Sequence, residues 1–117
     1  MKKIYHLSSC NTCKKIIQEL NPTADITLQD IKAEPISEAQ LTEMKKLAGS
    51  YEALFSRKAM LYRERNLKEK SLTETDYKNL ILEHYTFLSR PVTIANNKIF
   101  IGNARKAVDG AKQALHE

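Results

Sequence analysis

The fold of this chain is decided by one stretch, YHLSSCNTC, which occupies residues 5–13. It follows the short apolar run Ile4-Tyr5, which is typical of a β-strand, and it precedes residues 14–20, where apolar side chains recur at helical spacing. Cys13 lies on the apolar face of that predicted helix, so we expect it to be buried. Cys10 falls at the helix entrance, where backbone N–H groups have no intrahelical partner.

The position of Cys10 favours chemistry at its sulfur. The positive end of the helix macrodipole stabilises a thiolate, and a thiolate is the reactive form of cysteine. Cys-x-x-Cys between a strand and a helix therefore indicates a redox or nucleophile site. A structural zinc site would need four ligands, and the chain has no second cysteine pair and no His-x-x-x-His. Two buried, inert cysteines remain the alternative.

His6 lies four residues before Cys10 and is a candidate for stabilising its thiolate. The alternative is a polar residue at the end of a strand. The sequence alone does not distinguish the two.

The remainder of the chain predicts an α/β protein. The helix after Cys13 ends at Asn21-Pro22. Ile26, Leu28 and Asp30 alternate with Thr27 and Gln29, which indicates a second, half-buried strand from about Asp25. These elements form a βαβ unit. A helical block follows, in which Ser37 with Gln40 predicts a capping box and Gly49 predicts the end of the helix.

A second capped helix is predicted from Thr73 with Asp76, and the last third returns to β structure. Residues 92–95 and 98–101 are β-branched runs joined by Asn96-Asn97, which predicts a tight hairpin. An apolar stripe containing Ala107, Val108 and Ala111 then predicts a final helix.

Composition points to an ordinary globular chain: 117 residues, 42% hydrophobic and 28% charged. We expect a single domain in the cytoplasm, with no signal peptide and no membrane span. In that compartment a Cys-x-x-Cys is more often catalytic or regulatory than structural. The net charge of +5 is concentrated in residues 57–70, where a solvated, ion-paired surface is the simplest interpretation. No pattern predicts direct nucleic-acid binding.

Four segments together give the chain a family resemblance. They are residues 5–13, Phe55-Ser56-Arg57-Lys58, residues 61–67 (LYRERNL) and Leu88-Ser89-Arg90-Pro91-Val92. Their order and spacing resemble the ArsC/Spx family of arsenate reductases, Spx redox regulators and YffB-type thiol reductases. The resemblance covers nearly the whole chain. It implies a thioredoxin-like (glutaredoxin-like) α/β fold, with a four-stranded mixed sheet and a helical insertion between its βαβ and ββα halves. The halves would be residues 1–32 and 88–117, and the insertion about 35–87, within one domain spanning 1–117.

The resemblance also implies an oxyanion site. In thioredoxin-like folds the proline that matches Pro91 is cis and lies beside the active cysteine, which would bring Arg90 near Cys10. In arsenate reductases the arginines that match Arg90 and Arg57 bind the oxyanion, and a guanidinium suits an oxyanion because it offers a planar fork. Two surface arginines are the alternative. The predicted catalytic residues are Cys10, Cys13, His6, Arg57 and Arg90, and the predicted substrate-binding residues are Asn11, Thr12, Arg57, Arg90 and Pro91; no metal ligand is predicted.

Two positions depart from the arsenate reductases. Their third arginine aligns with Ile101-Gly102 in this chain, and Arg105 lies further along in the predicted last helix. Their serine is replaced by Cys13, which permits an intramolecular disulfide. Both departures weigh against arsenate as the substrate.

The leading hypothesis is therefore a thiol-dependent reductase, an arsenate reductase-like oxidoreductase. Cys10 would attack an oxyanion or an oxidised thiol, and Cys13 would resolve the intermediate. No bound cofactor is expected, and glutathione with glutaredoxin, or thioredoxin, would be the reductant and partner. The alternative is a Spx-like transcriptional regulator that binds the RNA polymerase alpha subunit and uses the cysteine pair as a switch.

Overall fold

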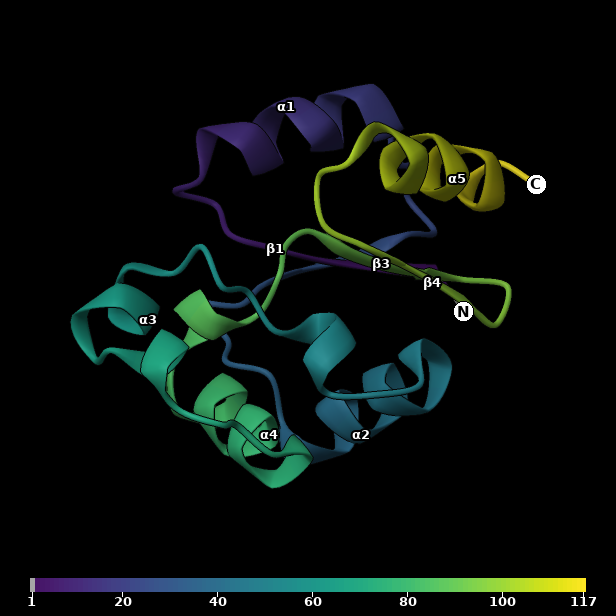
Figure 1. Cartoon of the computed structure of the whole chain (residues 1–117). Helices are drawn as coiled ribbons and strands as arrows, with labels where there is room; N and C mark the ends of the chain where they lie inside the picture. The colour runs from purple at the N-terminus through teal and green to yellow at the C-terminus, as the bar shows by residue number, and fades with distance from the viewer. Residues whose placement is uncertain (1) are drawn as a thin grey trace. The chain divides into compact units, whose positions relative to one another are not determined.

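The computed structural model describes residues 2–117 and divides the chain into two compact units. One unit combines the residues up to Pro35 with Arg90–Glu117 and contains the β-sheet, and the other is the helical segment Ile36–Ser89 (Figure 1). The order of elements is β-α-β, then helices, then β-β-α. The predicted α/β fold is confirmed.

The sheet unit is built on a four-stranded mixed sheet with the order β2-β1-β3-β4. Its strands are β1 (Lys2–His6), β2 (Thr27–Asp30), β3 (Val92–Ala95) and β4 (Lys98–Ile101). β1 runs parallel to β2 and antiparallel to β3, and β4 runs antiparallel to β3. Helices α1 (Asn11–Leu20) and α5 (Arg105–Leu115) cover the same face of this sheet (Figure 1). The four-stranded mixed sheet that the family resemblance implied is confirmed.

The hairpin between β3 and β4 forms where Asn96-Asn97 predicted it. Both asparagines have positive φ, 54° and 63°, which asparagine tolerates better than most residues. A two-residue turn with both residues in that region matches the twist of the flanking strands. This turn sets the register of β3 against β4, in which Val92 pairs with Ile101.

β2 shows that alternation alone predicts the buried face of an edge strand poorly. Leu28 is 45% exposed, whereas Gln29 is buried. The buried Gln29 amide donates a hydrogen bond of 2.9 Å to the Glu34 carbonyl, which offsets the cost of removing it from water.

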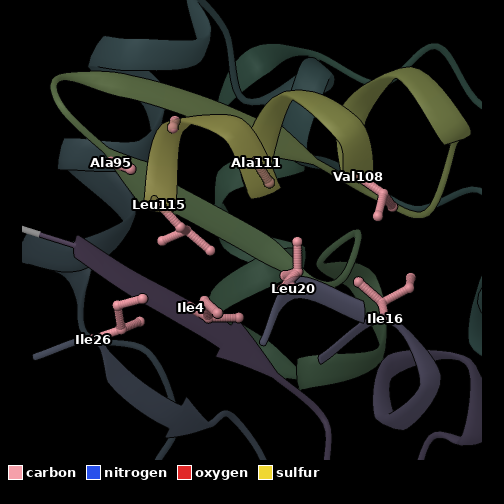
Figure 2. Packing of buried hydrophobic residues seen from close by; sticks show 9 residues of the cluster. Ile4, Ile16, Leu20, Ile26, Ala95, Val108, Ala111 and Leu115 are labelled. Carbon is pink, nitrogen blue, oxygen red and sulfur yellow. The ribbon is translucent and has the colours of Figure 1, made fainter. Parts of the chain in front are cut away.

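The core of the sheet unit lies between the sheet and its two helices (Figure 2). Leu115 and Val108 of α5 point toward Leu20 and Ile16 of α1 and toward Ile4 of β1. Ile4 and Leu20 are fully buried. The helix that carries Cys10 is therefore anchored by its apolar face.

We expect Leu20→Ala to destabilise the protein by about 2–5 kcal/mol, because it removes buried methyl groups and leaves a cavity under α1. Urea unfolding followed by circular dichroism measures this change. Leu28→Ala is the matched control, since Leu28 is 45% exposed, and it should cost well under half as much. Equal losses for the two variants would contradict the packing described here.

The helical unit contains α2 (Glu38–Ala48), α3 (Met60–Glu64) and α4 (Glu74–Glu83) with the 3-10 turns Glu52–Leu54, Leu67–Glu69 and Tyr85–Phe87. Both predicted capping boxes are present. Ser37 and Gln40 cap α2, and Thr73 and Asp76 cap α4. α2 ends at Gly49 with φ of 96°, so all three boundary predictions are confirmed.

Candidate functional site

Cys10 is the N-cap residue of α1. Its backbone is extended, its N–H donates to the Leu7 carbonyl at 3.0 Å, and its carbonyl accepts the first helical hydrogen bond from Lys14 at 3.0 Å. The side chain is only partly buried, so the sulfur remains open to a reactant. The exposed residues Asn11 and Thr12 form the first turn beside it.

The surroundings of Cys10 favour its thiolate. Burial raises the pKa of the Cys10 thiol, but the backbone N–H groups of Cys13 and Thr12 act against it. The Cys13 side chain, as a hydrogen-bond donor, and the positive charge of Arg90 lower the pKa further. The net pKa of Cys10 lies below its ordinary value of 9.0. These are the helix-entrance effects expected from the sequence.

Cys13 has the opposite character. It is 1% exposed, and its burial is the main reason that its pKa rises to about 11. The hydrogen bond to Cys10 and the negative charge that Cys10 carries raise it further, while the Leu7 backbone and Arg90 lower it. Both cysteines are free thiols. One helical turn therefore holds a thiol that ionises more readily than an ordinary cysteine beside one that ionises less readily.

Arg90 and Pro91 lie in the same unit as Cys10. The Arg90-Pro91 peptide bond is cis, as the resemblance implied, and it precedes β3. The Arg90 guanidinium is close enough for its charge to lower the pKa of both cysteines. The fold thus brings together residues 80 positions apart in the sequence. Their roles in binding a substrate stay predictions.

A clamp between Ser8 and Asp30 holds the loop before Cys10, and sequence reasoning missed it. The Asp30 carboxylate accepts hydrogen bonds from the Ser8 hydroxyl at 2.6 Å and the Ser8 N–H at 3.3 Å. These contacts, with the Lys32 N–H, lower the pKa of Asp30. Asp30 is the last residue of β2, which pairs with β1. A single Asp at the end of a strand is a weak sequence signal for a contact with the loop after β1.

His6 ends β1 opposite Asp30 in the strand register. Its charge contributes to lowering the pKa of Asp30, whereas it is not among the causes that act on Cys10. The structure therefore places His6 beside Asp30 of the Ser8–Asp30 clamp. A direct effect of His6 on the Cys10 thiolate stays a prediction.

The two other arginines considered above have carboxylate partners. Arg57 belongs to the helical unit, where it contacts Glu52 at 2.7 Å and the Tyr77 hydroxyl at 3.0 Å. Its role in anion binding stays a prediction. Arg105 is the first residue of α5, as expected, and it pairs with Glu19 and Asp109. Glu19 lies nine residues beyond Cys10, about 13 Å along α1 at 1.5 Å per residue.

The opposite pKa shifts predict a large difference in alkylation between the cysteines. In Cys13→Ser, alkylation of Cys10 should reach its plateau below pH 9, because serine preserves a hydrogen-bond donor. In Cys10→Ser, alkylation of Cys13 should still rise above pH 9, because burial persists after the Cys10 charge is removed.

At pH 7 the ratio of the two rates should exceed about 10, since each pKa unit changes the thiolate fraction tenfold. Iodoacetamide rates followed by mass spectrometry measure it. If Cys10 reacts no faster than free cysteine, the nucleophile has been misassigned.

Two further features of the described residues are relevant here. Within residues 2–117, no group of three His, Cys, Asp or Glu side chains is arranged to hold a metal ion. None of the helices in that range combines the length and apolar character needed to cross a membrane.

Comparison with known proteins places this geometry in a family. The chain is 28% identical over 113 residues to the Escherichia coli protein YfgD, covering 91% of this chain and 92% of YfgD. An arsenate reductase from Vibrio cholerae shares its fold, with a TM-score of 0.72, 21% identity and coverage of 97% of this chain and 96% of that one.

An arsenate reductase-related protein from Brucella melitensis superposes with a TM-score of 0.70 and 22% identity, covering 93% of this chain and 92% of its own. The sequence model of the ArsC family matches residues 5–111, which include both cysteines and Arg90. This chain therefore belongs to the ArsC family.

Proposed function

We propose that this protein is a thiol-dependent reductase in which Cys10 is the nucleophile and Cys13 the resolving cysteine. The observation that carries the proposal is the placement of two free thiols one helical turn apart, Cys10 partly exposed at the entrance of α1 and Cys13 buried behind it. This placement lowers the pKa of Cys10, through hydrogen bonds from Cys13 and Thr12 and the charge of Arg90, and burial raises that of Cys13 to about 11. A nucleophile needs to be ionised near neutral pH, whereas a resolving thiol is better held protonated until an adduct has formed.

The reaction balances with two electrons from the cysteine pair. With a disulfide substrate, the Cys10 thiolate attacks one sulfur, forms a mixed disulfide and releases the other sulfur as a thiolate. Cys13 then loses its proton and attacks the Cys10 sulfur. This step releases the second substrate thiolate and leaves a Cys10–Cys13 disulfide. The substrate gains the two electrons that the dithiol loses.

An oxyanion such as arsenate would follow the same course. Cys10 displaces an oxygen of As(V), which leaves as water, and Cys13 then attacks Cys10 so that the arsenic departs as As(III). Arg90 supports this reaction because a guanidinium can donate two parallel hydrogen bonds to an anion beside the Cys10 sulfur. The Vibrio cholerae protein of the same fold is named an arsenate reductase, which supports the same class of substrate.

The disulfide must be reduced for a second turnover. We propose glutaredoxin with glutathione, or thioredoxin, as the reductant, because each supplies a dithiol or thiols that exchange with an accessible disulfide. No bound cofactor is needed, since the electrons reside in the cysteine pair. Oxidation of NADPH by the coupled reductase, dependent on arsenate or on a disulfide, tests the activity directly.

Mild oxidation should convert Cys10 and Cys13 to an intramolecular disulfide, since the two side chains already form a hydrogen bond to one another. Intact mass spectrometry should show the loss of two hydrogens and no dimer. Cys13→Ser provides the control, because it should give only adducts or dimers through Cys10. Adducts or dimers from the unmodified protein would remove Cys13 from the resolving role.

A further inference from the structure

The turn that leads from β1 into Cys10 needs support from outside itself. It consists of residues 7–10 and is closed by the hydrogen bond from the Cys10 N–H to the Leu7 carbonyl at 3.0 Å. Leu7 is buried, but the central residues Ser8 and Ser9 are both exposed. The turn contains neither glycine nor proline, the residues that most strongly preset a turn. Exposed backbone with few buried contacts opens easily, so a single conformation depends on contacts from elsewhere in the fold.

Asp30 supplies these contacts through both of its carboxylate oxygens. Oδ2 accepts a hydrogen bond from the Ser8 hydroxyl at 2.6 Å, and Oδ1 accepts from the Ser8 N–H at 3.3 Å and the Lys32 N–H at 3.2 Å. A carboxylate suits three donors because its oxygens only accept hydrogen bonds. The same contacts, led by the Ser8 hydroxyl, lower the pKa of Asp30 below its ordinary value of 3.8. The carboxylate is therefore ionised at neutral pH and holds Ser8 by both backbone and side chain.

The sheet fixes the position of Asp30. Asp30 is the last residue of β2 and lies opposite His6 in the parallel register. The N–H of the next residue, Ile31, donates to the His6 carbonyl at 2.9 Å, and the Ile31 side chain is 1% exposed. Asp30, Ser8 and Cys10 all belong to the sheet unit. The Ser8–Asp30 clamp thus ties the turn to a rigid strand end.

The backbone of the turn determines where the Cys10 sulfur lies. Cys10 ends the turn in an extended conformation, with φ of −91° and ψ of 117°, and is also the N-cap residue of α1. Backbone hydrogen bonds from Cys13 and Thr12 help to lower the pKa of its thiol. Hydrogen bonds weaken steeply as their angle departs from linearity. Motion of the turn would therefore move the sulfur away from the groups that stabilise its thiolate.

We propose that Ser8 and Asp30 are positioning residues for the nucleophile, which hold the turn of residues 7–10 so that the Cys10 sulfur stays beside the N–H groups at the entrance of α1. This inference rests on the proposed function and adds two residues to its site. The clamp acts through the backbone and takes no part in the transfer of electrons or protons.

The sign of the change in the pKa of Cys10 distinguishes positioning from a direct effect of charge. A nearby carboxylate charge by itself raises the pKa of a thiol, so its removal alone would lower that pKa. Release of the turn acts in the opposite direction. Ser8→Ala keeps the charge and should raise the pKa of Cys10 by about 0.5–1, because partly formed hydrogen bonds stabilise the thiolate less. Asp30→Asn should raise it by less, since loss of the charge offsets part of the effect.

Iodoacetamide rates against pH, measured in the Cys13→Ser background, give these pKa values without any turnover. Ser8→Thr keeps the hydroxyl and should restore the pKa, whereas Ser9→Ala, at the other exposed position of the turn, should leave it unchanged. Leu20→Ala weakens packing at the far end of α1 and should not raise the pKa in the folded protein. An unchanged or lower pKa in Ser8→Ala, or an equal rise in Leu20→Ala, overturns the proposal.

A double variant tests whether the two residues act as one unit. In Ser8→Ala/Asp30→Asn the pKa of Cys10 should be no higher than in Ser8→Ala, because the contact has already been lost. Amide hydrogen exchange followed by NMR reports the turn itself. The Cys10 N–H should exchange faster in Ser8→Ala than in the unmodified protein, while the Val108 N–H of α5, bonded to the Ala104 carbonyl, should not change. Further rise of the pKa in the double variant would show that the residues act separately and overturn the clamp.

The pH profile of turnover connects the clamp to the proposed function. In Ser8→Ala, kcat/KM for a disulfide should fall by up to about tenfold at pH 6, since each pKa unit changes the thiolate fraction tenfold. It should recover at pH 9, where the thiolate is restored. A raised pKa and faster exchange in a protein that turns over no disulfide or arsenate would overturn the reductase and keep the clamp. Turnover with an unchanged pKa and unchanged exchange in Ser8→Ala would overturn the clamp and keep the reductase.

Discussion

Replacement of Cys10 by serine is expected to lower disulfide or arsenate turnover by at least about 10³-fold, because loss of a nucleophile removes the first covalent step altogether. Serine is nearly the same size, and Cys10 is only partly buried, so the fold should remain intact. Coupled NADPH oxidation gives the rate, and circular dichroism verifies the fold.

Cys13→Ser should lose turnover at a different stage. Its Cys10 thiolate still attacks the substrate, but the mixed disulfide cannot be resolved within the chain. Mass spectrometry should therefore show a stoichiometric adduct on Cys10 when the variant is mixed with glutathione disulfide. Ser9→Ala, a change at an exposed neighbour, provides the control and should retain turnover. Full activity of Cys10→Ser would refute the mechanism.

Arg90→Lys should weaken anion-dependent turnover by roughly 10- to 100-fold. Lysine keeps the positive charge but loses the planar fork, and hydrogen bonds to charged groups contribute on the order of 1.5–3 kcal/mol each. The pKa of Cys10 should change less than in Arg90→Gln, because the charge that lowers it is retained. Arsenate kinetics and sulfate titration monitored by NMR measure the two effects.

Arg105→Lys is the matched control for this experiment. Its guanidinium pairs with Asp109 of α5 and with Glu19 of α1. Glu19 lies about 13 Å along α1 from Cys10, so arsenate turnover should not change. Arg57→Lys tests the sequence-based assignment of Arg57 in the same assay. Unchanged arsenate turnover and unchanged sulfate binding in Arg90→Lys would show that the oxyanion is not held by Arg90.

Features that depend on neighbours in the chain were predictable from the sequence. The N-cap position of Cys10, the capping boxes at Ser37 and Thr73, and the Asn96-Asn97 turn all match the structure. Each depends on hydrogen bonds or φ preferences that act within about four residues. The burial of Cys13 follows equally from the helical spacing of the apolar residues around it.

Features that depend on contacts between distant segments were decided only by the tertiary structure. The exposed side of Leu28 and the buried Gln29 reflect the place of β2 at the edge of the sheet. The clamp of Asp30 on Ser8 needs β1 and β2 to lie side by side.

The electrostatics of the site have the same origin. Residues around Cys10 suggested an ionisable thiol, and the resemblance suggested Arg90 as its neighbour. Pairing of β3 with β1 is what brings position 90 to the cysteines. The sequence by itself therefore determined which thiol stands at the helix entrance. The fold decided which charges surround that thiol, because Coulomb interactions depend on distance in space and local sequence does not specify it.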